Sequence, residues 1–299
     1  MTERYGGQAV LTGVMMRGTD AWSVACRRPD GGIELRVEPL PTWGARWKKV
    51  PVVRGIVALA EALPLGYRAL AWSAEVGLGA VKRKARWWEK LATFAVVTAI
   101  VVVASSLPAA AARWVADAAG VGGAAPVIEA SLGIALLYGY LRVIGRLADV
   151  RRLFQNHGAE HKVVNAHEAG VPLTIEAVQA HSTRHPRCGT SFLLVVAVVS
   201  AVFYAVVGLS DVGGLGGLVV TRVLALPLIA GVAAELQLRL AEAIDAPWVR
   251  VLMRPGIALQ RLTTREPADD QVEVAIIALQ AVLPLEPAMF VDDQSSGSR

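Results

Sequence analysis

The stretch "FLLVVAVVSAVFYAVVGL", residues 192–209, contains no charged residue and is long enough to cross a lipid bilayer as a helix. A helix of about 20 apolar residues spans a hydrocarbon layer about 30 Å thick. Three further segments are nearly as apolar, and they run from Leu91 to Ala112, from Pro126 to Ile144 and from Leu215 to Leu236. Their apolar residues form continuous runs instead of the spaced pattern of a soluble amphipathic helix. The sequence therefore predicts an α-helical integral membrane protein with about four transmembrane helices.

The overall composition agrees with this fold class. Of the 299 residues, 54% are hydrophobic and only 18% are charged, whereas a soluble domain has about 25% charged residues. Two cysteines are too few for a disulfide framework, and their wide separation in the sequence fits a reducing compartment. The first 50 residues contain no apolar segment of the signal-peptide type, so we expect neither cleavage nor export.

Short connections between the apolar segments predict two helical hairpins. "RWVADAAGVGGAA", residues 113–125, joins the first pair, and "SDVGGLGG", residues 210–217, joins the second pair. Of the 30 lysines and arginines, only Arg113 lies in these two connections. Because Lys and Arg are retained on the cytoplasmic side, we expect a multi-pass plasma-membrane protein whose two termini and central loop are cytoplasmic. Topology thereby explains the net charge of +5, and we expect the lipid bilayer, not nucleic acid, as the partner.

The residues before the first span predict a small β-rich segment and then helices at the membrane surface. "AWSVACRRPDGGIELRVEPL", residues 21–40, alternates apolar with polar residues around a "PDGG" turn, which predicts a β-hairpin. "QAVLTGVMMRG", residues 8–18, adds a candidate strand. Residues 54–79 contain four charged side chains and Pro64, so they favour a broken helix lying in the interface over a fifth span.

These patterns divide the chain into six segments. They are an N-terminal cytoplasmic β-rich segment (1–50), interfacial helices (51–90), the first transmembrane hairpin (91–144), a cytoplasmic loop with His and Cys (145–190), the second transmembrane hairpin (191–238), and a C-terminal cytoplasmic segment with an amphipathic helix and a disordered tail (239–299).

All five histidines lie within the central cytoplasmic loop, where "HGAEHK" occupies residues 157–162. A spacing of four residues places His157 and His161 one helical turn apart on the same face, so both imidazoles can face one ion. This H-x-x-E-H arrangement is the one found in inverted zincins, where the histidines bind the metal and the glutamate is the general base. Glu168 shares that face, but helical rise places it about 13 Å from the midpoint of the histidine pair, too far to bind the same ion.

Further ligands are available in "HPRCG", residues 185–189. The two-residue gap between His185 and Cys188, with a proline inside it, is typical of a zinc knuckle. Together with the helical pair, these residues predict a zinc site formed by His157, His161, His185 and Cys188. The alternative is that Cys188 is a small buried hydrophobic residue and the histidines are polar residues near lipid headgroups. His167 and His181 fit neither spacing, and we expect them on solvated faces.

Four stretches of the chain carry a resemblance to a known family. They are "YGGQAVLTGVMMRG" (5–18), "HGAEHKVVNAHEAGVPLT" (157–174), "HPRCGTSF" (185–192) and "LQRLTTREPADDQVEVAIIAL" (259–279). In these stretches the chain resembles the DUF1385, or YqhQ-like, family of bacterial membrane proteins, described as predicted metal-dependent enzymes. The resemblance implies a bacterial origin and a metal, without an assigned reaction. The positions that match its motifs are His157, Glu160, His161, Lys162, His185, Arg187 and Cys188.

The N-terminal "GGQAVLTGVMMRG" also needs a structural explanation. Two adjacent glycines permit a turn or a close approach of the backbone, and Met15 and Met16 could pack against the metal loop or a second subunit. A strand with a glycine bulge is the simpler interpretation, and we favour it.

Two classes of function stay open. In the first, three protein ligands and a water bind the metal, Glu160 acts as the general base, and Lys162 and Arg187 bind the substrate of a membrane-surface hydrolase. In the second, His157, His161, His185 and Cys188 enclose a structural zinc ion, and the protein is a scaffold or a subunit of a homo-oligomer. Nothing in the sequence names a substrate.

Overall fold

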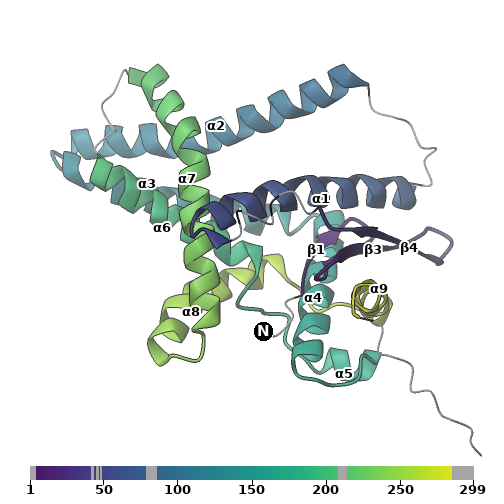
Figure 1. Cartoon of the computed structure of the whole chain (residues 1–299). Helices are drawn as coiled ribbons and strands as arrows, with labels where there is room; N and C mark the ends of the chain where they lie inside the picture. Colours follow the sequence, from purple (N-terminus) through teal and green to yellow (C-terminus); the bar gives the residue numbers. More distant parts are fainter. Residues whose placement is uncertain are drawn as a thin grey trace, which may run out of the picture.

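The computed structural model describes residues 5–41, 44, 47, 49–78, 86–207 and 214–284. The described chain is mostly helical, with one small antiparallel sheet at its N-terminal end (Figure 1). The predicted coarse fold, helices plus a small N-terminal β segment, is confirmed.

The sheet has four strands that follow one another in sequence order. They are β1 (Gly6–Val10), β2 (Gly13–Arg17), β3 (Ala21–Arg27) and β4 (Ile33–Pro39). The hairpin expected in residues 21–40 is confirmed as β3 and β4, which pair from Ala21 with Pro39 to Arg27 with Ile33. The stretch expected to add one strand forms two. Their register is continuous from Gly6 with Arg17 to Val10 with Gly13, so the expected glycine bulge was wrong.

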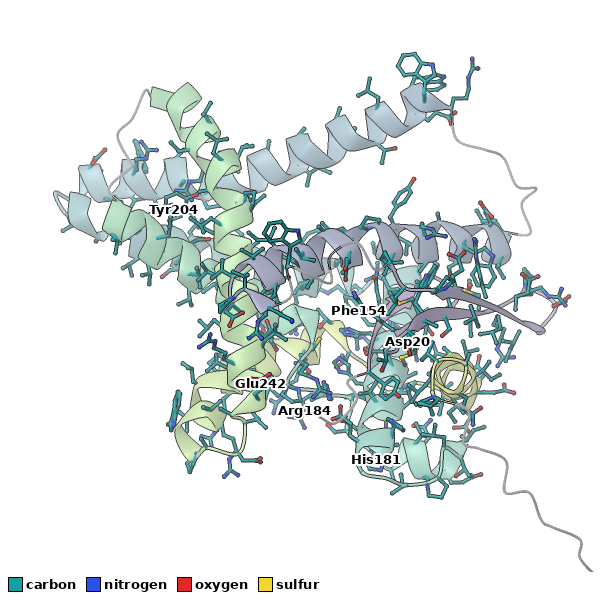
Figure 2. All side chains as sticks on the ribbon, viewed as in Figure 1. Asp20, Phe154, His181, Arg184, Tyr204 and Glu242 are labelled. Carbon is teal, nitrogen blue, oxygen red and sulfur yellow. The ribbon has the colours of Figure 1, made fainter. Side chains whose placement is uncertain are left out.

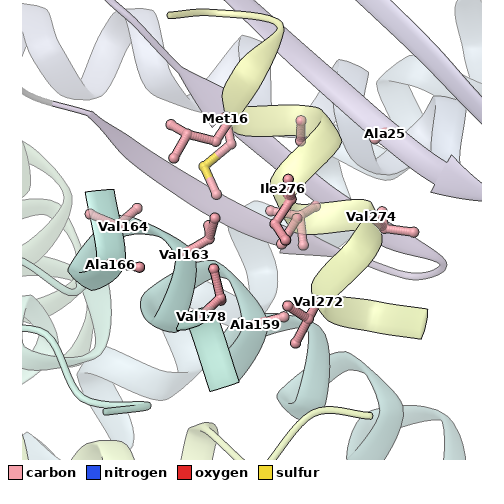
Figure 3. Packing of buried hydrophobic residues seen from close by; sticks show 14 of the residues in the cluster. Met16, Ala25, Ala159, Val163, Val164, Ala166, Val178, Val272, Val274 and Ile276 are labelled. Atoms are coloured by element: carbon pink, nitrogen blue, oxygen red, sulfur yellow. The ribbon is translucent and has the colours of Figure 1, made fainter. Parts of the chain in front are cut away.

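Helices cover both faces of the sheet and form a packed core with it. Helix α1 (Val53–Leu78) lies on one face, and α4 (Ala148–Glu168) and α9 (Asp269–Gln280) lie on the other (Figure 1). Trp22, Val24 and Leu65 are buried together on the α1 side. Met16, Val163 and Ile276 are buried together on the α4 side (Figure 3). Alternate residues of each strand point to opposite faces, which explains why neighbouring residues such as Met15 and Met16 enter different cores.

Helix α1 differs from the broken interfacial helix expected from residues 54–79. It is a single helix that includes Pro64 and packs against the sheet and α7 (Gly214–Glu242). Three of its four charged residues, Arg54, Glu61 and Arg68, form ion pairs within the protein. The buried Glu61 accepts a hydrogen bond from Arg17 of β2 at 2.8 Å, and Arg54 binds Glu235 of α7 at 2.6 Å.

Three glycines of α1, each 11 residues from the next, face three different partners. A Cβ atom at Gly55 would lie 2.7 Å from the main-chain oxygen of Gly231 in α7. A Cβ at Gly66 would lie 2.3 Å from the Gln8 side chain, and one at Gly77 would lie 2.6 Å from Thr12. Because 11 residues are about three helical turns, the three glycines lie on one face of α1.

Four long helices coincide with the four predicted spans. They are α2 (Trp87–Ala118), α3 (Ala125–Ile144), α6 (Gly189–Val207) and α7. Within the described residues, three segments are long and apolar enough to cross a membrane: Gly122–Ile144, Gly189–Val206 and Val220–Glu242. The fourth predicted span, within α2, is not one of these three. In the expected 210–217 connection, residues 210–213 lie outside the described residues, and Gly214 already begins α7.

Charged residues inside the apolar helices bind one another. Arg222 of α7 forms an ion pair with Glu129 of α3, in which the Nη2–Oε2 distance is 2.6 Å. The Arg222 guanidinium also lies 3.7 Å from the ring centroid of Tyr204 in α6 (Figure 2). These contacts connect three helices through groups that would be costly to leave unpaired in lipid.

The C-terminal segment returns to the core around the sheet. Helix α8 (Pro247–Thr263) follows α7, and the connection after it passes over α4, where the main-chain N–H of Arg265 donates to the Phe154 oxygen at 2.9 Å. Helix α9 then packs against the sheet, as the amphipathic pattern predicted. The expected disordered tail, residues 285–299, lies outside the described residues.

Candidate metal centre

Helix α4 presents the H-x-x-E-H residues beside β1 and the loop before α6. The connection after α8 lies against Gly158, where a Cβ atom would be only 2.0 Å from the Arg265 oxygen. This close approach brings the main chain of the α8–α9 connection next to His157. The helical spacing predicted from the sequence is therefore present, and the surroundings of the helix come from segments far away in the chain.

Three of the four predicted metal ligands converge. His157, His161 and Cys188 each offer a ligand atom, and the three atoms lie within 4.8 Å of one another. The Cys188 Sγ lies 3.3 Å from His157 Nε2. A zinc ion with Zn–N distances of about 2.0 Å and a Zn–S distance of about 2.3 Å would hold such atoms between 3 and 4 Å apart. The 3.3 Å distance between Cys188 Sγ and His157 Nε2 lies in this range.

The two histidine rings are held in the tautomer that a metal requires. His157 Nδ1 lies 2.8 Å from the Thr263 main-chain oxygen, and His161 Nδ1 lies 2.6 Å from that of Thr183. A carbonyl oxygen only accepts hydrogen bonds, so each Nδ1 carries a proton, and in the neutral ring the lone pair is on Nε2. Hydrogen bonds of this kind from the second ring nitrogen orient histidine ligands in metal sites.

Cys188 immediately precedes α6 and is fixed from several sides. Its Sγ lies 3.1 Å from the Thr190 hydroxyl oxygen and accepts a hydrogen bond from the Thr190 main-chain N–H at 3.4 Å. Gln237 of α7 donates to the Cys188 main-chain oxygen at 3.0 Å. The sulfur is therefore positioned by the first turn of one apolar helix and by a side chain of another.

Glu160 lies beside the cluster without being part of it. Its Oε2 is 3.5 Å from His161 Nε2 and 3.9 Å from His157 Nε2, and the side chain is almost fully buried. Burial lowers the pKa of His161, but the Glu160 carboxylate and Cys188 raise it more, so the net shift is upward. The distances from the Glu160 carboxylate to the two Nε2 atoms place it within reach of a group held at the cluster.

His185, the fourth predicted ligand, lies next to the cluster with its ring nitrogens engaged elsewhere. Its ring centroid is 6.0 Å from that of His161. Nε2 lies 3.2 Å from a Glu168 carboxylate oxygen, and Nδ1 accepts a hydrogen bond from the Arg187 main-chain N–H at 3.3 Å. Burial lowers the pKa of His185 despite the opposing effect of Glu168. Metal binding by His185 stays a prediction, because it would require the ring to leave Glu168.

The two cations assigned to substrate binding occupy different surroundings. Arg187 lines the cavity at the cluster and forms an ion pair with Glu168. Lys162 is buried under α5 (Ile175–Gln179), where its Nζ donates to the Gln179 oxygen at 2.7 Å and lies 3.0 Å from Glu266. Lys162 is not among the described residues that line the cavity.

The remaining histidines lie outside the cluster, as expected. The His167 ring packs edge-on against Tyr5, with 4.9 Å between the centroids. His181 follows α5 and is partly exposed (Figure 2).

Two comparisons with known proteins bear on this chain. The family described as "Protein of unknown function (DUF1385)" matches residues 50–285. The chain belongs to the DUF1385 family. It is also 34% identical to the uncharacterized protein YqhQ of Bacillus subtilis (strain 168), over 94% of this chain and 93% of that protein. No solved structure matches it. The DUF1385 match includes α4 and Cys188, whereas β1 and β2 precede it.

A cavity of about 360 Å³ opens at the cluster of this DUF1385 protein. Its walls come from the cluster, from β1 and β2, and from helices α1 and α7. Besides His157, Glu160, His161, His185, Arg187 and Cys188, the wall includes Tyr5, Gly6, Gly7, Gln8, Met15, Arg17, Gly18, Ala62, Leu65, Val164, Gly189 and Leu238. From the sequence, only the match of residues 5–18 to the family and the possible packing of Met15 and Met16 against the metal loop indicated that the N-terminal strands lie here.

Gly7 explains part of that N-terminal motif. A Cβ atom at Gly7 would lie 2.7 Å from Glu160 Cγ and 2.6 Å from the Met15 main-chain oxygen. The glycine therefore allows the Glu160 side chain to lie against β1, at the wall of the cavity. Close approach of the backbone, one of the two interpretations of the glycine pair, is the one found here.

Proposed function

We propose that the protein is a multi-pass membrane protein of the bacterial plasma membrane that carries a metal-dependent hydrolase site on its cytoplasmic side. The observation that carries this proposal is the convergence of His157, His161 and Cys188, with the Nδ1 atom of each histidine bonded to a main-chain oxygen and Glu160 beside them. Three protein ligands next to an open cavity are typical of catalytic zinc sites, whereas structural zinc sites have four.

The chemistry of the donor set fits zinc. Two imidazoles and a thiolate match the ligand preferences of a borderline-soft divalent ion. A zinc ion held there would polarise a substrate carbonyl and make a water molecule more acidic. Glu160 is placed to accept the proton of that water, which is the role of a general base. Arg187 and Arg17 line the same cavity and supply positive charge for a carbonyl-bearing or anionic substrate.

The membrane location rests on the apolar helices. Three of them meet the length and hydropathy of a span, and α2 contains the fourth predicted span, Leu91–Ala112. We infer two transmembrane hairpins, α2 with α3 and α6 with α7. Because the two connecting loops contain only Arg113 among the 30 lysines and arginines, the termini and the metal centre face the cytoplasm.

A second candidate function is favoured by the position of His185. Its ring lies 6.0 Å from that of His161, so rotation away from Glu168 would bring a fourth ligand to the cluster. A closed set of four ligands would make the metal structural. The protein would then be a scaffold, or a subunit of a homo-oligomer, in which the metal joins α4 to the start of α6.

The first experiment measures bound zinc and its coordination in protein purified without chelators. We expect one zinc per chain, and X-ray absorption should report two nitrogens, one sulfur and one oxygen from water. His161→Ala should lose the zinc, because each ligand contributes to a site whose binding energy is partly folding energy. His181→Ala is the matched control and should keep it, since His181 lies outside the cluster.

Glu160→Gln then separates the two functions. The hydrolase proposal expects this variant to keep stoichiometric zinc and the wild-type melting temperature. It should hydrolyse fluorogenic peptides and p-nitrophenyl esters at least a hundredfold more slowly than wild type, because a general base contributes about 10²–10⁴ in rate. Loss of zinc from Glu160→Gln, or four protein ligands in the wild type, would favour the scaffold.

A further inference from the structure

The outer edge of β1 leaves main-chain hydrogen-bonding groups unused. Strand β1 is at one end of the sheet and pairs only with β2. Only two residues connect the strands, so Val10 and Gly13 form a hydrogen-bonded pair, and pairing then alternates along β1. The N–H and C=O groups of Gly7 and Ala9 therefore point away from β2. Among the described residues, none forms a hydrogen bond with these groups.

This edge also lacks the charged residues and prolines that often protect an exposed strand. Charged side chains and prolines discourage a second chain from pairing with a sheet edge. The opposite edge, β4, carries Glu34, Arg36, Glu38 and Pro39. Strand β1 carries no charged residue and no proline, and it begins with two glycines. A chain approaching β1 would thus meet backbone instead of side chains.

The open edge and the metal cluster face the same cavity. Gly6, Gly7 and Gln8 line it together with His157, His161 and Cys188. The Glu160 side chain touches the position where a Gly7 Cβ would be, so the carboxylate is next to the strand. A backbone paired with β1 would therefore lie beside the cluster and the proposed general base.

We propose that the cavity binds an extended polypeptide segment, which pairs with β1 through Gly7 and Ala9 and presents a peptide carbonyl to the cluster. Addition of a peptide strand to an exposed sheet edge is a common mode of peptide recognition. This inference rests on the proposed hydrolase function and specifies its substrate class. In the reaction, the oxygen of a water molecule bonds to the carbonyl carbon and Glu160 accepts its proton. The C–N bond then breaks, and that proton passes to the departing amine nitrogen.

The experiment compares two zinc-binding probes on the full-length protein in detergent, loaded with zinc. One is acetohydroxamate, and the other is an acetylated Ala-Val-Ala-Val peptide that ends in a hydroxamate. Both bind zinc through the same group, but only the peptide can pair with β1. We expect the peptide to bind at least tenfold more tightly, because several main-chain hydrogen bonds each add a factor of about two to ten.

Ala9→Pro tests the edge directly. Proline removes the outward N–H of residue 9 and leaves the pairing of β1 with β2 intact, since that N–H is not part of the ladder. The variant should bind acetohydroxamate as the wild type does and the peptide about tenfold more weakly. Ala9→Ser keeps the N–H and should bind both probes normally. Methylating peptide nitrogens one at a time should weaken binding at alternate residues only, as strand pairing requires.

The outcomes separate this inference from the function on which it rests. If acetohydroxamate binds and the peptide binds no more tightly, or if Ala9→Pro does not affect the peptide, the pairing with β1 is wrong while the metal site stands. If the protein holds no zinc, or if zinc is present and neither probe binds, the proposed hydrolase site itself fails.

Discussion

The polar helix α4 has many buried residues, whereas the apolar helix α3 has almost none. Helix α4 contains six charged residues and three histidines, yet ten of its 21 residues are buried. Helix α3, all 20 residues of which are described, is much more apolar and buries only Leu141. In water, apolar side chains are the ones that become buried. The contrast indicates that the exposed side of α3 is suited to lipid, while α4 belongs to the packed core around the sheet.

The polar residues of α4 can be buried because each has a partner. Asn156 donates to the Val10 oxygen at 3.0 Å and accepts from Gln271 at 2.8 Å. Lys162, His157 and His161 likewise bond to main-chain oxygens. Burying a polar group without a hydrogen bond costs about 1–3 kcal/mol, and these contacts avoid that cost. Such satisfied polar groups hold a site in one geometry.

A lysine in the middle of α3 tests the contrast most strongly. Leu136 lies in the middle of α3, and its side chain is 49% exposed. If α3 crosses a bilayer, Leu136→Lys should cost about 2.5–3.5 kcal/mol in insertion. We expect a large loss of protein from the membrane fraction of cells. Leu35→Lys is the control, because Leu35 of β4 is 46% exposed and should tolerate the charge. Equal membrane recovery of both variants would break the comparison.

A methyl group between β1 and α4 has an intermediate effect. Gly7→Ala would place a Cβ 2.7 Å from Glu160 Cγ and 2.6 Å from the Met15 oxygen. Overpacking of this kind costs about 1–3 kcal/mol. The variant should melt several degrees below wild type in detergent. At Gly6 nothing lies within 4 Å of an added Cβ, so Gly6→Ala should melt as wild type. A lowered melting temperature for Gly6→Ala alone would contradict the packing described for α4.

The smallest effect concerns the charge partner of the buried lysine of α4. Lys162 is 4% exposed and Glu266 is largely exposed, with 3.0 Å between their charged atoms. Because solvent screens the exposed partner, Glu266→Gln should cost at most about 1 kcal/mol. The hydrogen bond from Lys162 to the Gln179 oxygen remains in this variant. Chemical denaturation measures the change, and a larger loss would mean that the ion pair, not the hydrogen bond, keeps Lys162 buried.

The sequence predicted those parts of the fold and site that depend on local spacing. The apolar runs located four helices, and the four-residue interval of His157 and His161 placed both rings together. Cys188 lies at the cluster, whereas His185, its partner in the predicted knuckle, is turned toward Glu168. Glu168 is not part of the cluster, as its distance along α4 predicted. The chain between α5 and α6 brings His185 back to Glu168.

Contacts between distant segments could not be predicted in this way. Nothing near Gly7 in the sequence indicates Glu160 as its neighbour. In the same way, the charges of α1 suggested headgroups because their partners, Arg17 for Glu61 and Glu235 for Arg54, lie in other elements. Local sequence patterns predict where a helix forms, but they do not predict which residues of other elements contact it.

The glycines of α1 make this helix a spacer of fixed length between the sheet and the apolar helices. Gly55 fixes one end against α7, and Gly66 and Gly77 fix the other against the first β-hairpin. Contacts 11 residues apart are separated by about 16 Å, and each residue contributes about 100° of rotation. Inserting a single alanine between Gly55 and Gly66 would therefore lengthen the spacer by only about 1.5 Å. It would also rotate Gly55 by about 100° relative to Gly66 and Gly77, so the three glycines would no longer lie on one face. The helix tolerates substitution on its outer side, whereas its residue count is set by the two bodies that it joins.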